Sequence, residues 1–236
     1  MSNQAEKIHE LATVAPHEAP LSLLERLQKQ WYIIVAAAFV VVVAIGGYMM
    51  YSNAQQEKNE EANTALSRIR TVFDQGEFEK ALTAKGMAPI GNETVLGLEA
   101  IVEEYGGTDA GKLASLMAGN CYVNLGKYAE AQGQFENAQN SDAPLVQVGA
   151  LTGLGACKEQ ENDWAGAAEL YERAAGISGK SGLEDRCLLY AGLAYEKAGN
   201  KEKAAKSFTD IVKRNEGSEY ASFAKTGLAR LGMAID

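Results

Sequence analysis

The sequence predicts an all-α protein in which a single N-terminal transmembrane helix is followed by an α-solenoid. Three observations support this prediction. Residues 32–51, YIIVAAAFVVVVAIGGYMMY, contain no charge. A glycine–alanine–aromatic pattern recurs three times beyond them. Finally, no run after residue 52 alternates β-branched with polar residues, as a half-buried strand would.

The apolar segment is expected to cross a membrane. At a rise of about 1.5 Å per residue, a helix of this length spans the roughly 30 Å hydrocarbon core of a bilayer. Aromatic residues lie at both ends of the run: Trp31 and Tyr32 at its start, and Tyr48 and Tyr51 at its end. Aromatic rings favour the headgroup zone of a bilayer. We therefore assign residues 31–51 to a transmembrane helix in contact with the lipid bilayer.

Charges beside this segment predict its orientation. Arg26 and Lys29 lie just before it, whereas Lys58 is surrounded by glutamates after it. Because basic residues favour the cytoplasmic side, residues 1–30 are expected to form a cytoplasmic tail and the C-terminal domain to lie outside. A cleaved signal peptide ending near residues 52–54 is the alternative, but the apolar run exceeds the usual length of about 7–15 residues.

Residues 52–110 are predicted to form a juxtamembrane helix and a degenerate first repeat. The segment after the span is rich in helix formers and has neither proline nor glycine before Gly76. Gly76, Phe78 and Ala81 match the turn glycine, aromatic residue and alanine of the later units. Thr108 is a candidate N-cap for the next helix.

Residues 111–236 are expected to hold three repeats and a capping helix. Within each unit the glycine precedes the alanine by 12 residues and the aromatic follows 4 residues later, and the units start 36 and then 37 residues apart. The pattern occurs as Gly119, Ala131 and Phe135, as Gly155, Ala167 and Tyr171, and as Gly192, Ala204 and Phe208. Gly227, 35 residues after Gly192, is predicted to hold the glycine position of the capping helix.

Small residues at fixed spacing allow two antiparallel helices to cross closely. We expect the glycine of the first helix to face the alanine of the second, with aromatic side chains filling the space beside them. Gly126 and Gly199 are expected to form the turn between the helices, because glycine reaches positive φ without penalty. Asn162 holds this place in the second unit, and asparagine is the next best residue there.

This pattern resembles the tetratricopeptide repeat, whose period is about 34 residues. The resemblance implies a tetratricopeptide-repeat α-solenoid whose concave face, formed by the first helix of each unit, binds protein or peptide partners. The predicted groove residues are Leu116, Asn120, Val123, Asn124, Thr152, Ala156, Glu159, Gln160, Arg186, Leu189, Leu193, Glu196 and Lys197. The alternative for Leu189 and Leu193 is that they pack on a neighbouring helix. A clamp for a C-terminal carboxylate is not expected, because Leu116 and Gly153 stand where it would need lysine and asparagine.

No pattern in the sequence indicates catalysis. The two histidines, His9 and His17, both lie in the N-terminal tail, and no phosphate-binding loop or metal-ligand cluster is present. We therefore expect no catalytic, metal or cofactor-binding residues and no small-molecule substrate. A net charge of −9 argues against nucleic acid. The three cysteines, Cys121, Cys157 and Cys187, are expected to be small buried residues.

The whole arrangement is similar to the membrane-anchored tetratricopeptide proteins of Gram-negative bacteria that serve as ancillary subunits of the Sec translocon. The segment EYGGTDAGKLASLMAGNCYVNLGKYAEA is especially like that group, and the similarity extends over most of the chain from about residue 25. It implies a scaffold or chaperone at the periplasmic face of the inner membrane, with the Sec translocon and exported polypeptides as partners. The alternatives are a fixed structural subunit of another envelope complex and an enzyme regulator that faces the cytoplasm.

Overall fold

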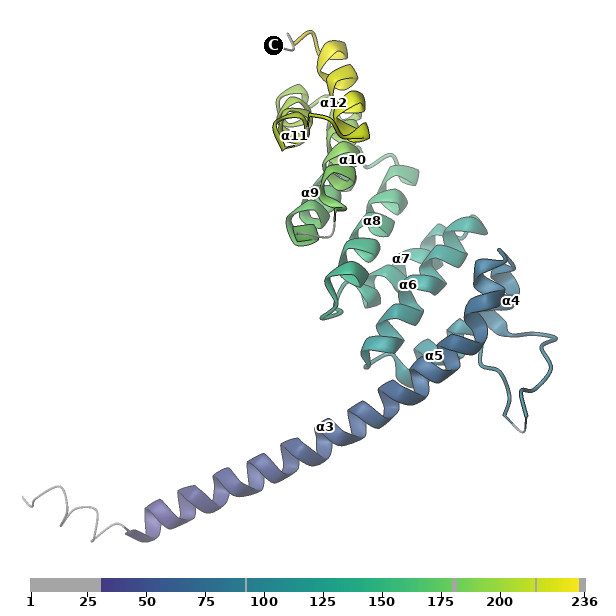
Figure 1. Cartoon of the computed structure of the whole chain (residues 1–236), viewed down its shortest axis with the longest axis vertical. Helices are drawn as coiled ribbons and strands as arrows, with labels where there is room; N and C mark the ends of the chain where they lie inside the picture. Colours follow the sequence, from purple (N-terminus) through teal and green to yellow (C-terminus); the bar gives the residue numbers. More distant parts are fainter. Residues whose placement is uncertain (1–30, 92, 180–181, 215, 234–236) are drawn as a thin grey trace, which may run out of the picture. The chain divides into compact units, whose positions relative to one another are not determined.

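The computed structural model describes residues 31–91, 93–179, 182–214 and 216–233, and these residues are helical apart from turns, loops and one isolated β-bridge between Ile90 and Glu93. The all-α prediction is confirmed for this part of the chain. The predicted tail, residues 1–30, lies outside the described residues. In order, the helices are α3 (Trp31–Asp74), α4 (Phe78–Thr83), α5 (Leu98–Tyr105), α6 (Asp109–Asn124), α7 (Tyr128–Ala138), α8 (Pro144–Gln160), α9 (Trp164–Ser178), α10 (Glu184–Lys197), α11 (Lys201–Arg214) and α12 (Glu219–Arg230) (Figure 1).

The chain divides into two compact units, and the first ends at Asn53. Its described part is the beginning of α3, which is long and apolar enough to cross a membrane. Every described side chain from Trp31 to Asn53 is exposed within the protein. A core helix of similar composition would be buried, whereas the described residues leave the side chains of this stretch exposed.

The second unit begins at Ala54 and contains the helical repeats. It opens with the rest of α3, which continues to Asp74 and buries Ala62 and Ile69 completely. Gly76 then takes φ +77° and turns the chain into α4, as the sequence predicts. Phe78 begins α4, and Ala81 is fully buried. Gly76 and Ala81 therefore have the backbone conformation and the burial expected of the turn glycine and the alanine.

The second helix of this first unit is interrupted. Ala84 ends α4 with φ 51°, residues 84–91 and 93–97 lie outside the helices, and α5 resumes the packing at Leu98 (Figure 1). Leu98 is fully buried. A hydrogen bond fixes the register, because Glu99 accepts from the hydroxyl of Tyr122. Because of this insertion, the second half of the unit does not follow the constant spacing of the later repeats.

Three regular helix pairs follow, α6 with α7, α8 with α9, and α10 with α11. In each pair the aromatic ring of the second helix lies on the glycine of the first. An alanine Cβ built at Gly119 would lie 2.5 Å from Cε1 of Phe135, and one at Gly192 would lie equally close to Phe208. The expectation that glycine faces alanine is thus wrong in detail, since the nearest atoms are those of the ring. Carbon atoms prefer separations of about 3.5–4.0 Å, so only glycine fits.

The aromatic ring also contacts the next repeat, and this contact corrects the predicted register of α12. Phe135 lies between Gly119 of α6 and Gly153 of α8, and Phe208 lies in the same way between Gly192 and Gly227. Gly227 therefore corresponds to Gly153 and not, as predicted, to Gly192. The residue equivalent to Gly192 is Ala229, 37 residues further on, which is exposed.

The turns between paired helices have the predicted left-handed conformation. Gly126 and Gly199 have φ values of +72° and +78°, and Asn162 takes φ +62°. At the start of α6, Thr108 accepts a hydrogen bond from the backbone nitrogen of Gly111, so the predicted N-cap is confirmed. These local features give the successive helix pairs the same geometry.

Candidate functional site: a groove between α8, α10 and α12

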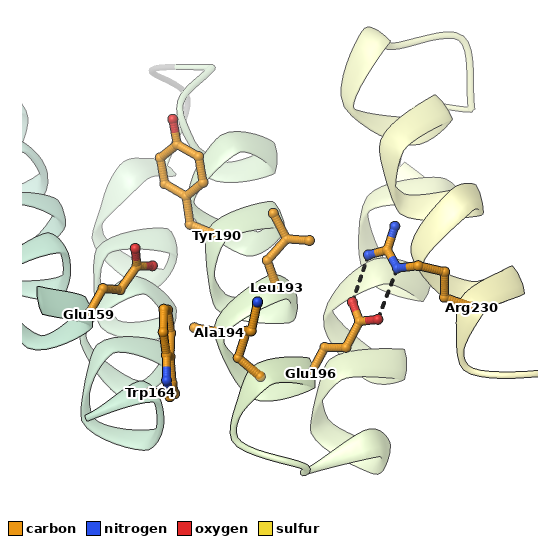
Figure 2. A pocket seen from close by; sticks show the side chains of 8 residues that line it. Glu159, Trp164, Tyr190, Leu193, Ala194, Glu196 and Arg230 are labelled. Atoms are coloured by element: carbon orange, nitrogen blue, oxygen red, sulfur yellow. Dashed lines mark hydrogen bonds and ion pairs between the residues drawn. The ribbon is translucent and has the colours of Figure 1, made fainter. Parts of the chain in front are cut away.

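A groove of about 690 Å³ opens between the first helices of successive repeats (Figure 2). We call it the α10 groove, because α10 supplies most of its lining. One residue comes from α8, one from the start of α9 and one from α12. Its lining residues are Glu159, Trp164, Tyr190, Leu193, Ala194, Glu196, Lys197 and Arg230.

The groove exists because one repeat has tyrosine where its neighbours have glycine. In α8, Gly153 lies two residues before the repeat glycine and packs on the ring of Phe135 in the preceding repeat. In α12, Gly227 has the corresponding position and packs on the ring of Phe208. In α10 this residue is Tyr190, whose ring centroid lies 5.4 Å from that of Tyr171. The additional ring separates the helices: α8 and α10 approach less closely than α6 and α8 or α10 and α12. Tyr190 thus keeps the groove open.

Two exposed apolar side chains on α10 form the face of the groove. Tyr190 is 39% exposed and Leu193 is 38% exposed, whereas most large apolar residues of the repeats are buried. Trp164 lies beside them at the start of α9. Tryptophan, tyrosine and arginine are the residue types that most often dominate binding energy at protein interfaces. The lining therefore has the composition of a protein-binding surface.

An ion pair closes one wall of the groove. Arg230 of α12 donates to both carboxylate oxygens of Glu196 of α10, with Nε–Oε1 and Nη2–Oε2 distances of 2.9 and 2.6 Å (Figure 2). The hydrogen bonds from Arg230 lower the pKa of Glu196. A bidentate pair of this kind fixes the geometry of both groups. These two charges therefore neutralise each other.

The remaining two charges of the groove lie on different helices. The ammonium of Lys197 lies 5.7 Å from the centroid of the Trp164 ring, a cation–π distance. Glu159 of α8 accepts a hydrogen bond of 3.1 Å from the hydroxyl of Tyr171. Burial and the neighbouring Glu159 both raise the pKa of that hydroxyl, so it remains a donor.

Four of the predicted groove residues, Glu159, Leu193, Glu196 and Lys197, line the α10 groove. Leu189 does not: it is only 8% exposed and belongs to the core formed by α8 to α12. It lies four residues before Leu193 on the same helix, so the sequence pattern alone does not separate them. The prediction that Leu189 faces a partner is therefore wrong, and the alternative of packing within the array is correct for this residue.

The other predicted residues lie outside this groove. Leu116 is half-buried and covers Gly149 of α8, while Asn124 donates from its side chain to the backbone oxygen of Asn120. The hydroxyl of Thr152 donates to backbone oxygens of its own helix. The remaining residues, on α6, α8 and α10, are partly or fully exposed: Val123, Ala156, Gln160 and Arg186.

Sequence reasoning missed Trp164, Tyr190, Ala194 and Arg230. Trp164 aligns with Tyr128 and resembles a core residue in the sequence, although its place at the first position of α9 puts it beside α10. Arg230 was missed because the register assigned to α12 was wrong. The difference between Gly153 and Tyr190 was a usable signal, because it is visible once the repeats are aligned.

The described residues offer no alternative chemical site. Cys121, Cys157 and Cys187 are all buried, as predicted. Burial raises the pKa of the Cys121 thiol to about 12, so it is protonated and unreactive at neutral pH. In the described part of the chain, no three histidine, cysteine or acidic side chains are grouped so that they could hold a metal ion.

Comparison with known families agrees with this geometry. Residues 27–175 match the family described as a tetratricopeptide repeat-like domain, and residues 186–218 match the tetratricopeptide repeat. The chain belongs to the tetratricopeptide repeat-like family, since the first match covers more than half of it. No curated protein matches the chain at a significant level. Proteins of this class bind other proteins, and the α10 groove is the surface best suited to that role here.

Proposed function

We propose that the protein is a membrane-tethered scaffold that holds a polypeptide partner in the α10 groove. The observation that carries this proposal is the exposed pair Tyr190 and Leu193 beside Trp164 in a groove of about 690 Å³. An apolar cleft with few polar groups of fixed position is the usual form of a binding site. A partner that fills it would remove these side chains from water, at about 25 cal/mol for each Å² of apolar area covered.

The α3 segment from Trp31 to Tyr51 is proposed to be the membrane anchor. Its support is its length, its apolar composition and the exposure of its side chains within the protein. Arg26 and Lys29 before the segment favour a cytoplasmic N-terminus. The repeats would then lie at the periplasmic face of a bacterial inner membrane, where emerging polypeptides near the Sec translocon are candidate partners and the scaffold would have a chaperone-like role.

Photocrosslinking in cells tests the proposal. A photoreactive amino acid at Leu193, which lines the groove, should give adducts with a partner, whereas the same group at Glu202 on the exposed face of α11 should give few. Several different exported proteins in the adducts would support a chaperone-like role. A single stoichiometric partner would instead indicate a fixed subunit of an envelope complex. Equal yields from the two positions would contradict groove binding.

Protease protection tests the orientation separately. In spheroplasts with an intact inner membrane, added protease should digest the repeats after residue 54 if they are periplasmic. Complete protection that disappears when the membrane is lysed would place the repeats in the cytoplasm. That result would overturn the proposed location and leave groove binding to be judged by the crosslinking.

A further inference from the structure

We propose that the occupant of the α10 groove is a segment of a partner protein in which a basic residue stands next to an apolar anchor side chain. This inference rests on the proposed function and specifies the chemistry of the partner. It depends on the charges around the groove, and above all on the carboxylate of Glu159.

Glu159 is the anion of the groove that lacks a cation. In the described part of the chain, no lysine or arginine lies within ion-pair distance of its carboxylate, and the one side-chain hydrogen bond that the carboxylate accepts comes from the neutral hydroxyl of Tyr171. The adjacent Lys158 is engaged by Glu161, with an Nζ–Oε2 distance of 2.7 Å. Glu159 is already half-buried. An occupant without a positive charge would desolvate this carboxylate further and leave it unpaired, which is costly.

The two cations of the groove, Arg230 and Lys197, do not require an acidic residue in the occupant. Arg230 already binds Glu196 through two hydrogen bonds. The ammonium of Lys197 lies over the Trp164 ring, and the Lys197 side chain is exposed, so it keeps its water when a partner binds. An exposed ion pair to Lys197 would contribute little, because surface pairs are worth about 0–1 kcal/mol. Local complementarity therefore favours a cation beside Glu159 over an anion beside Lys197.

The net charge of the repeat unit acts in the same direction. Residues 54–236 hold 27 acidic and 19 basic residues, a net charge of −8, so this unit attracts basic segments over a distance of about one Debye length and repels acidic ones. The apolar part of the occupant is set by Tyr190 and Leu193, whose exposed surfaces need an aliphatic or aromatic side chain to cover them. In a segment with a lysine or arginine next to such an anchor, the anchor covers Tyr190 and Leu193 and the basic side chain pairs with the carboxylate of Glu159.

Tryptophan fluorescence can test this preference on the full-length chain. The chain has two tryptophans, so Trp31→Phe leaves Trp164 of the groove as the single reporter. The protein is placed in phosphatidylcholine bicelles, which contain no tryptophan and whose neutral lipid does not attract charged peptides. Three nine-residue peptides with blocked ends serve as probes: Gly-Ser-Leu-Lys-Leu-Lys-Leu-Ser-Gly, its counterpart with glutamate for lysine, and its counterpart with serine for leucine.

The leucine–lysine peptide should saturate the Trp164 signal with a Kd at least tenfold lower than that of the leucine–glutamate peptide, a difference of about 1.4 kcal/mol. The serine–lysine peptide should not saturate. Glu159→Gln, which keeps an acceptor for Tyr171, should remove most of the preference, and Glu159→Lys should reverse it. Glu202→Gln is the matched control, because it removes one negative charge from α11 outside the groove and should leave the preference intact.

The proposal is overturned if the leucine–glutamate peptide binds as tightly as the leucine–lysine peptide. It is also overturned if Glu202→Gln and Glu159→Gln reduce the preference equally, since only the net charge would then matter. Absence of saturation by the leucine–lysine peptide at about 1 mM, equivalent to about −4 kcal/mol, would contradict it too. Crosslinking from Leu193 would stand in all three cases, so loss of the charge preference is distinguishable from failure of the proposed function.

Discussion

Replacing Gly192 with alanine should destabilise the repeats, because Phe208 has no room to move away. The new Cβ would lie 2.5 Å from Cε1 of that ring, about 1 Å inside the preferred separation of carbon atoms. On the opposite side the ring already lies against Gly227 of α12. Overpacking of a filled core costs about 1–3 kcal/mol, and the higher helix propensity of alanine returns up to about 1 kcal/mol. After the full return from helix propensity, we expect a net loss of up to about 2 kcal/mol in the free energy of unfolding.

Gly176→Ala provides the matched control. Gly176 lies in α9 and is exposed, and an alanine Cβ at this position would meet no atom of a neighbouring element within 4 Å. This change should therefore stabilise the protein by about 0.5–1 kcal/mol through helix propensity alone. Circular dichroism at 222 nm during urea or thermal unfolding measures both variants, and about 2–4 °C in Tm is expected per kcal/mol for a domain of this size. A Gly192→Ala protein as stable as Gly176→Ala would refute the packing that defines the repeat.

Three further predictions concern single side chains. Cys121 should react very slowly with a maleimide between pH 7 and 9 and rapidly in urea, because burial raises the pKa of its thiol to about 12; fast labelling of the folded protein would contradict its burial. The pKa of Glu196, measured by carboxyl NMR, should lie below its ordinary value and return towards it in Arg230→Gln. The stability that this pair contributes is present above the ordinary glutamate pKa and is lost as the pH falls through the lowered pKa of Glu196. If the pKa of Glu196 is the same in Arg230→Gln as in the unchanged chain, the ion pair is excluded. Tyr195→Phe should cost about 1 kcal/mol, because its hydroxyl donates to Glu172 of the preceding repeat, and no loss in urea unfolding would show that this bond does not matter.

The regular part of the fold could be predicted because its determinants are local. Glycine and an aromatic residue at a fixed interval decide how two neighbouring helices cross, and Gly126 or Asn162 decides the turn between them. The first unit was only partly recognisable. Its second helix breaks at Ala84, and Leu98 takes over the core position after an insertion, so constant spacing no longer applies.

The binding surface was harder to predict because it depends on contacts between repeats. Helical spacing places Leu189 and Leu193 one turn apart on the same helix, yet Leu189 packs inside the array and Leu193 faces the groove. The groove itself follows from Tyr190, which stands where the neighbouring repeats have glycine. Such a substitution is visible in the sequence, but its effect on helix separation is not.

The most direct test of the account is whether Tyr190 creates the surface that binds the partner. Crosslinking from a photoreactive group at Leu193 should be measured in cells for the unchanged chain and for the variants Tyr190→Phe and Tyr190→Gly. Phenylalanine keeps the ring beside Tyr171 and should preserve the adducts, whereas glycine allows α10 to approach α8 and should reduce their yield at least tenfold at equal protein level. Undiminished adducts in Tyr190→Gly would contradict the account, because the partner would then bind without the groove.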